Sequence, residues 1–342
     1  MRPEESAEDS TLRRLEGLLL GGPRTLTLRD VAERAGIDIE EARLFWHALG
    51  MPTSEPDAVA YTEQDAAVVA RTAHARQEFE VRDETAVSLV RSVGHTTDRL
   101  VLWQTEALVQ HLSERFSLDD ASARLLLLDR LGDVLPVLEL QLVHAWRRHL
   151  AAQAARIEQE LMGRHREPDS DELPLARAVG FADIVKFTSR TASLGSHDLA
   201  DFVQAFETRA RDVVTAAGGR VVKTIGDAVL FVADDPRAGA EVALGLAEAF
   251  GLESASPVRV GLVWGRVLSR FGDVFGPAVS LAARLTSAAA PGTVLLDPAT
   301  AAALPAGLLL EEQAERSFPG IGRVRPVRLA RPERPARPDR PA

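Results

Sequence analysis

The chain has 342 residues, a length typical of about two domains, and 40 basic against 50 acidic side chains give it a formal charge of −10. The net acidity argues against a general nucleic-acid-binding protein, and the lack of cysteine excludes disulfide frameworks, thiolate zinc sites and cysteine nucleophiles. No apolar stretch approaches the roughly 20 residues of a membrane span, and the acidic start is unlike a signal peptide. These features predict a soluble, cytoplasmic protein with no membrane partner.

The first half of the chain has a helical pattern. Residues 1–10 are polar and are expected to be disordered. Apolar side chains then recur at helical spacing over residues 11–162, which predicts an all-α domain. Residues 27–50 have the pattern helix, turn at Gly36, helix, which is typical of a helix-turn-helix. Three arginines face five acidic residues there, so the net charge of 3 − 5 = −2 argues against DNA binding.

A long helix is predicted at the end of this half. Pro136 is typical of a helix start, and the helical pattern continues from it over residues 136–162. His144 and His149 lie on this helix, and His165 follows it. Histidine titrates near neutral pH, so these three side chains are candidates for a pH-sensitive regulatory element, or else they are ordinary helix histidines.

Two polar segments flank the second half of the chain. Residues 163–174 are charged and contain proline, which indicates a linker. Residues 331–342 form a tail of arginine and proline in which arginine continues a period of three that begins at Arg325. Polyproline II has three residues per turn, so the tail is either such a helix or a solvated, disordered segment.

Between these segments short apolar strands alternate with helices. The predicted elements are a strand at 176–183, helices within 187–217, a hairpin of strands 220–225 and 228–232, a helix at 236–250, strands at 258–264 and 266–270, a helix at 277–288 and a strand at 293–296. The order β-α-β-β-α-β predicts an α+β domain over residues 175–330 with the split βαβ, or ferredoxin-like, arrangement.

Two aspartates stand at the ends of apolar strands in this domain. Asp183 follows the first strand, and Asp227 lies in the turn of the hairpin. Such residues are often turn formers, but two of them can converge on Mg²⁺, which proteins hold through one or two carboxylates and substrate phosphates. The segment 184–190 opens a helix whose free N–H groups favour phosphate. Only two of the 40 basic residues are lysines, Lys186 and Lys223, and both lie in these motifs.

Three motifs in this half resemble a known family. FADIVKFTS, GGRVVKTIGDAVLFV and FGDVFGPAVSLAARL follow one another in the order found in the class III nucleotidyl cyclase catalytic domain. The resemblance covers about residues 176–300. It implies an adenylate cyclase that converts ATP into 3′,5′-cyclic AMP and pyrophosphate. Residues 11–165 are similar to the N-terminal regulatory domain of soluble actinobacterial adenylate cyclases, including pH-responsive ones.

The resemblance assigns roles to individual positions. Asp183, the backbone carbonyl of Ile184 and Asp227 match the ligands of two divalent metal ions, Mg²⁺ or Mn²⁺. Lys223 and Asp273 match the pair that reads the purine, and lysine with aspartate is the pair of adenylate-specific members. In the family the metal ligands and the purine-reading residues of one site come from different subunits. The resemblance therefore implies a homodimer with two equivalent sites.

The remaining positions include departures from the family pattern. Arg284 matches the arginine that contacts the phosphate as charge develops in the transition state. Ser280 stands where the family usually has an asparagine that contacts the ribose, and Lys186 replaces a glycine beside the phosphate-binding positions Phe187 and Thr188. These departures leave open a low-activity homologue that binds nucleotide and signals by conformation. A third hypothesis is a transcription factor with a cyclase-like sensor, and the acidic charge of the helix-turn-helix argues against it.

Overall fold

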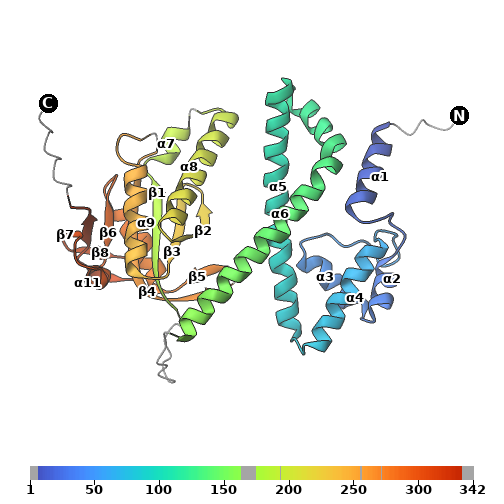
Figure 1. Cartoon of the computed structure of the whole chain (residues 1–342), viewed down its shortest axis with the longest axis horizontal. Helices are drawn as coiled ribbons and strands as arrows, with labels where there is room; N and C mark the ends of the chain where they lie inside the picture. Colours follow the sequence, from blue (N-terminus) through green and yellow to red (C-terminus); the bar gives the residue numbers. More distant parts are fainter. Residues whose placement is uncertain (1–6, 163–174, 193, 255, 271, 333–342) are drawn as a thin grey trace, which may run out of the picture. The chain divides into compact units, whose positions relative to one another are not determined.

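The structure of the chain is a computed structural model that describes residues 7–162, 175–192, 194–254, 256–270 and 272–332 (Figure 1). The chain divides into two compact units, Met1–Arg166 and Glu167–Ala342. Among the described residues, none of the helices has both the length and the apolar character that crossing a bilayer requires.

The first unit is helical. Its described elements are α1 (Ala7–Leu19), α2 (Leu28–Ala35), α3 (Ile39–Ala48), α4 (Glu63–Glu78), α5 (Asp83–Phe116) and α6 (Asp120–Met162). Helices α2 and α3 form the predicted helix-turn-helix. The Thr27 side chain accepts a hydrogen bond from the backbone N–H of Asp30 at the start of α2, and Gly36 ends the helix with φ of 66°. Leu28 and Val31 are fully buried beneath it.

Two boundaries predicted for this unit are wrong. Helix α1 begins at Ala7, although the polar composition predicts disorder through residue 10. Helix α6 begins at Asp120 and runs through Pro136, where the sequence predicts a helix start. An interior proline lacks a backbone donor and costs about 3 kcal/mol. Strong helix formers on both sides of it, and burial of Ala123 and Leu127 against Val109 of α5, stabilise the continuous helix.

The second unit is a mixed sheet with helices. Its described elements are β1 (Leu175–Ile184), α7 (Phe187–Thr191), α8 (Ser196–Ala216), β2 (Arg220–Ile225), β3 (Ala228–Ala233), α9 (Pro236–Ala249), β4 (Val258–Arg270), β5 (Asp273–Phe275), α10 (Pro277–Ala288), β6 (Val294–Leu296), α11 (Pro298–Ala303), β7 (Leu309–Glu312), β8 (Arg316–Phe318), β9 (Gly322–Val324) and β10 (Val327–Ala330). The sheet order β2-β3-β1-β4-β6-β10-β7 begins with the four antiparallel strands of the split βαβ arrangement. The predicted α+β, ferredoxin-like fold is confirmed.

Strand β1 is buried on both faces of the sheet. Ala178 and Ala182 pack into the cluster that β1 forms with α8 and α9, and Val179 packs into the cluster formed with α10. Helix α10 approaches the sheet closely at Gly261, where a Cβ atom would lie 2.4 Å from the backbone nitrogen of Thr286. Because side chains alternate between the two faces of a sheet, the odd-numbered residues of β1 and β4 point to the face that α10 covers.

Three regions of the second unit differ from the prediction. Strand β4 is continuous through Gly265, where the sequence predicts two strands. Asp273–Phe275 forms the short strand β5 against the end of β4, in a segment for which the sequence predicts no element. The arginine-rich segment does not begin as a polyproline helix, because Arg328 lies in strand β10 and Arg331 forms ion pairs with Glu241 and Glu248 of α9. Side-chain pairing to the domain thus competes successfully with solvation. The rest of the tail, from residue 333, and the predicted linker lie outside the described residues.

Candidate active site

The two aspartates predicted to bind metal lie close together, Asp183 near the end of β1 and Asp227 in the hairpin turn between β2 and β3. Asp183 is opposite Ala228 in the antiparallel pairing of β1 with β3, and Asp227 precedes that residue in the hairpin turn. The backbone N–H of Ile184 donates a hydrogen bond of 3.1 Å to the carbonyl oxygen of Asp227. Gly226, with φ of 61°, supplies the left-handed conformation that the turn requires. The end of β1 and the hairpin turn are therefore held together.

Burial raises the pKa of Asp183, and the negative charge of Asp227 acts in the same direction. The hydrogen bond and the charge of Arg259 oppose this rise without cancelling it. The carboxylates of Asp183 and Asp227 thus repel each other electrostatically. We call this pair, with the backbone of Ile184, the carboxylate corner. A divalent cation would offset both the free-energy cost of burying the Asp183 charge and the repulsion between the two carboxylates.

The corner has the donor chemistry of a magnesium or manganese site. Carboxylate oxygens, with a carbonyl oxygen such as that of Ile184, are the hard ligands that these ions prefer. Within the part of the chain that the structure describes, no group of three or more His, Asp or Glu side chains is placed to hold a metal ion. Asp183 and Asp227, with the carbonyl of Ile184, offer oxygen ligands of the kind that hold a cation together with substrate phosphates.

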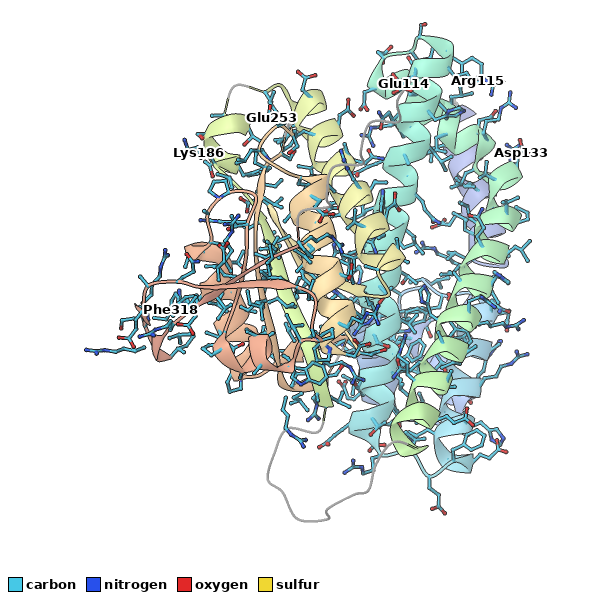
Figure 2. All side chains as sticks on the ribbon, turned by 60° about the vertical axis from the view of Figure 1, so that its left-hand side comes forward. Glu114, Arg115, Asp133, Lys186, Glu253 and Phe318 are labelled. Atoms are coloured by element: carbon cyan, nitrogen blue, oxygen red, sulfur yellow. The ribbon has the colours of Figure 1, made fainter. Side chains whose placement is uncertain are left out.

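Strand β1 leads into α7 through Lys186 (Figure 2). This residue has φ of 58° and ψ of 35°, a left-handed conformation that costs a non-glycine residue about 1 kcal/mol. This left-handed backbone explains why glycine is typical of the family at this position. The Lys186 side chain is exposed. Phe187 packs its ring against Phe202 with centroids 6.1 Å apart, whereas Thr188 is exposed. Their assignment to phosphate remains a prediction.

Lys223 and Asp273 form an ion pair between β2 and β5. The register of β2 against β3 shifts between Val221 and Lys223, and such a bulge changes the direction in which a side chain points. Asp273 also accepts a hydrogen bond of 2.8 Å from the N–H of Val274. The two residues that the sequence predicts to read a purine thus lie together although they are far apart in the chain.

The pKa of Asp273 is lowered from 3.8. Its burial favours the neutral acid, but the hydrogen bonds from Lys223 and Val274 and the charge of Lys223 outweigh that effect. A carboxylate with a lowered pKa stabilises the folded protein above the unfolded-state pKa of 3.8 and loses that contribution as pH falls through the folded-state value.

We therefore expect Asp273→Asn to lower the melting temperature by a constant amount between about pH 7 and pH 5. The difference from wild type should narrow below the unfolded-state pKa of 3.8, where Asp273 takes up a proton. Thermal melts in a pH series measure both regions. A difference that is constant down to pH 3 would show that the ionised carboxylate contributes nothing.

Ser280 and Arg284 lie on one face of α10. They are four residues apart, which places them on adjacent turns, and both side chains are exposed. The opposite face carries the buried residues Ala278, Ala282 and Leu285, which pack against the sheet. The helix therefore fixes the direction of both side chains and presents them at the surface of the second unit.

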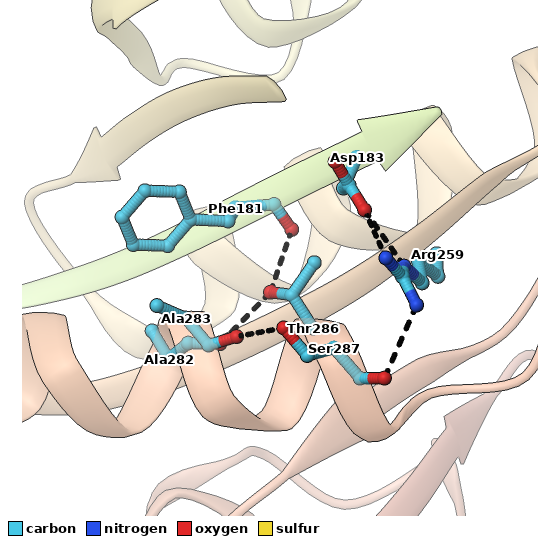
Figure 3. Close-up of polar contacts among 7 residues, drawn as sticks. All are labelled: Phe181, Asp183, Arg259, Ala282, Ala283, Thr286 and Ser287. Atoms are coloured by element: carbon cyan, nitrogen blue, oxygen red, sulfur yellow. Dashed lines mark hydrogen bonds and ion pairs between the residues drawn. The ribbon is translucent and has the colours of Figure 1, made fainter. Parts of the chain in front are cut away.

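Arg259 is a residue of the site that the sequence analysis missed. It is the register partner of Asp183 in the antiparallel pairing of β1 with β4, and its guanidinium contacts the Asp183 carboxylate (Figure 3). Opposite charges placed directly across two strands stabilise each other. The alternation of β4 gives the face on which Arg259 lies, but only the strand register places it opposite Asp183.

The candidate regulatory histidines lie in the first unit. His144 and His149 are both exposed on α6. His165 lies outside the described residues. The positions are compatible with solvent access, and their regulatory role remains a prediction.

Comparison with known proteins identifies the family. Residues 176–327 match the adenylate and guanylate cyclase catalytic domain. An adenylate cyclase of Glutamicibacter nicotianae is 41% identical over 94% of this chain and 82% of its own length, and one of Streptomyces coelicolor is 40% identical over 87% of this chain and 76% of its own. A pH-sensitive adenylate cyclase of Mycobacterium tuberculosis is 29% identical over 89% of this chain and 76% of its own length.

The chain belongs to the class III nucleotidyl cyclases, among the adenylate cyclases. The family inferred from the three sequence motifs is thereby confirmed. The cyclase match spans the sheet that carries Asp183, Asp227, Lys223 and Asp273, and the similarity to the adenylate cyclases extends into the helical first unit. Class III cyclases use divalent metal ions and act as dimers on a nucleotide.

Proposed function

We propose that this cyclase converts ATP into 3′,5′-cyclic AMP and pyrophosphate at sites shared by two copies of the chain. The observation that carries the proposal is the preformed ion pair of Lys223 on β2 with Asp273 on β5. The same domain brings Asp183 and Asp227 together at the end of β1 and the adjoining hairpin turn. Each chain would contribute its carboxylate corner to one site and its purine-reading pair to the other.

The Lys223–Asp273 pair matches adenine. The lysine ammonium can donate to adenine N1, and the aspartate can accept from the 6-amino group. Guanine presents a donor at N1 and an acceptor at O6, so both contacts become repulsive or unpaired. A polar site rejects an analogue that leaves its groups unpaired, because the desolvation of those groups is not compensated.

The proposed reaction joins the ribose 3′-oxygen to the α-phosphorus, and pyrophosphate leaves. Two divalent cations, Mg²⁺ or Mn²⁺, would lower the pKa of the attacking hydroxyl and neutralise the triphosphate. Asp183, Asp227 and the carbonyl of Ile184 would hold these cations. Arg284 would stabilise negative charge at the α-phosphate, and Ser280 would orient the ribose.

Purine selectivity tests this proposal. We expect the full-length chain to use Mn·ATP with kcat/KM at least about 100-fold above that for Mn·GTP, since mispaired polar groups exclude the wrong base. Lys223→Ala should lower kcat/KM for ATP and so lower the ratio of kcat/KM for ATP to kcat/KM for GTP. Arg220→Ala, a basic residue on the same strand, is the matched control. Equal use of ATP and GTP by the wild type would contradict adenine reading by this pair.

We further propose that the first unit regulates the enzyme, with protonation of His144 and His149 as the signal. The pH sensitivity of a Mycobacterium tuberculosis relative that matches both units supports this. Histidine changes charge near neutral pH, and both side chains are solvent-accessible.

The double variant His144→Ala, His149→Ala should flatten the pH–activity profile of the full-length chain between about pH 6 and pH 8. The matched control is His95→Ala, His111→Ala, which removes two exposed histidines of α5. Residues 170–342 alone should show the same flattened profile, since they lack the first unit. An unchanged profile in the α6 variant would refute the histidine signal.

A low-activity homologue is the alternative that two residues favour. Ser280 is shorter than the asparagine usual in the family, and Lys186 occupies a left-handed position that favours glycine. Saturable ATP binding without cyclic AMP production would support that alternative. The cytoplasmic location expected from the composition stays a prediction.

A further inference from the structure

The guanidinium of Arg259 bridges three parts of the second unit. Its Nε donates a hydrogen bond of 2.7 Å to Asp183 Oδ2, and a terminal nitrogen lies 2.6 Å from the same oxygen. The other terminal nitrogen donates a bond of 3.2 Å to the backbone carbonyl of Ser287 near the end of α10 (Figure 3). One side chain on β4 thus connects the end of β1 with α10.

The contacts with Asp183 are asymmetric. Nε and one terminal nitrogen of the guanidinium both contact Oδ2, and Oδ1 has no hydrogen-bond partner among the residues that the structure describes. The Asp183 side chain is 19% exposed, so this largely buried carboxylate has one oxygen that the described residues leave without a hydrogen bond. An arginine that blocked this carboxylate would be expected to occupy both oxygens in the bidentate geometry that it prefers.

The end of α10, which accepts the hydrogen bond from Arg259, is fixed against the sheet by its own contacts. The Thr286 hydroxyl donates a hydrogen bond of 2.8 Å to the carbonyl oxygen of Ala282, and the carbonyl oxygen of Phe181 on β1 lies 3.3 Å from the same hydroxyl. Gly261 of β4 admits the backbone of α10 directly against the sheet. Arg259 is therefore held by a rigid acceptor at Ser287, and a rigidly held donor restricts the rotamers of the carboxylate that it contacts.

We infer that Arg259 is a positioning residue for the metal site. It holds Asp183 by Oδ2 so that Oδ1 is kept open for a divalent cation, and the end of α10 fixes the guanidinium in place. The inference rests on the proposed metal role of Asp183. It assigns to Arg259 an effect on metal affinity in the absence of nucleotide.

Binding of Mn²⁺ alone to the full-length chain tests the inference. The electron paramagnetic resonance signal of free Mn²⁺ measures bound metal without any turnover. Arg259→Gln should weaken Mn²⁺ binding by about 10- to 100-fold, the usual effect of losing a group that orients a metal ligand. Arg259→Lys keeps one charge but cannot bridge to Ser287, so its affinity should lie between wild type and Arg259→Gln.

Arg316→Gln is the matched control. Arg316 donates a hydrogen bond of 2.8 Å to the carbonyl of Ala288, the residue after the Arg259 acceptor, whereas the ion pair with Asp183 is made by Arg259. This variant loses an equivalent tether of the α10 end and should bind Mn²⁺ like wild type. Equal weakening by Arg316→Gln and Arg259→Gln would overturn the inference, because the effect would then come from α10 alone.

Two further outcomes separate the inference from the proposal on which it rests. If Arg259→Gln binds Mn²⁺ as tightly as wild type, or more tightly, while Asp183→Asn loses binding, the positioning role is refuted and the metal site stands. If Asp183→Asn also binds like wild type, the metal site itself is wrong. If thermal melts show that Arg259→Gln is unfolded, the comparison of Arg259→Lys with wild type decides, and equal Mn²⁺ affinity overturns the inference.

Discussion

Asp227→Ala should reduce cyclic AMP production by on the order of 1,000-fold. A metal ion contributes several kcal/mol of transition-state stabilisation, and each 1.4 kcal/mol is worth a factor of ten in rate. Asp227 lies in the hairpin turn whose carbonyl holds the end of β1, and Ala preserves that backbone contact. The loss should therefore be catalytic and leave the fold unchanged. Initial rates with saturating Mn·ATP measure it.

The control for this prediction is Asp212→Ala. Asp212 is an exposed residue of α8 in the same unit, so its loss removes one negative charge without changing the carboxylate corner. It should retain wild-type activity. Asp227→Ala could instead retain more than about a tenth of the wild-type rate with an unchanged melting temperature. A loss of less than tenfold corresponds to under about 1.4 kcal/mol of barrier, which would contradict a role as metal ligand.

Mixing two inactive variants should restore activity, and this is the second large effect. Asp227→Ala would remove a proposed metal ligand, and Arg284→Ala would remove the arginine that we propose acts in the partner's site. A heterodimer of the two has one site with both defects and one intact site. Random reassortment makes half of the dimers heterodimers, so an equimolar mixture should recover about a quarter of wild-type activity.

The same experiment has an internal control. Asp183→Ala and Asp227→Ala damage the same half-site, so their heterodimer has one defect in each site and should remain inactive. Recovery in this second mixture, or none in the first, would contradict the division of the site between subunits. Each mixture needs time to exchange subunits before the assay.

The elements that carry chemistry could be predicted from the sequence because their signals are local. The turn around Gly226 and the strand before Asp183 are marked by turn residues and apolar runs, and the structure has β1, β2 and β3 in these places. The joint role of Lys223 and Asp273, 50 positions apart in the chain, followed from the family resemblance, and the structure adds the ion pair between them. Composition and periodicity alone do not give it.

What the sequence did not predict depends on tertiary contacts. Pro136 has the local signal of a helix start, yet packing of α6 against α5 carries the helix through it. Strand β5 is three residues long, too short for any periodicity, and forms only because β4 extends to Arg270 and offers an edge. Arg259 gains its significance from the β1–β4 register, which a single sequence does not specify.

We propose that this chain cyclises ATP although it has serine at position 280 and lysine at position 186. The most direct measurement is simultaneous release of cyclic AMP and pyrophosphate from Mn·ATP by the full-length chain, beside the Asp227→Ala variant. We expect equal amounts of the two products, at a rate far above that of the variant. Saturable binding of ATP with no cyclic AMP above the variant would contradict it, and the chain would then be a nucleotide-binding homologue.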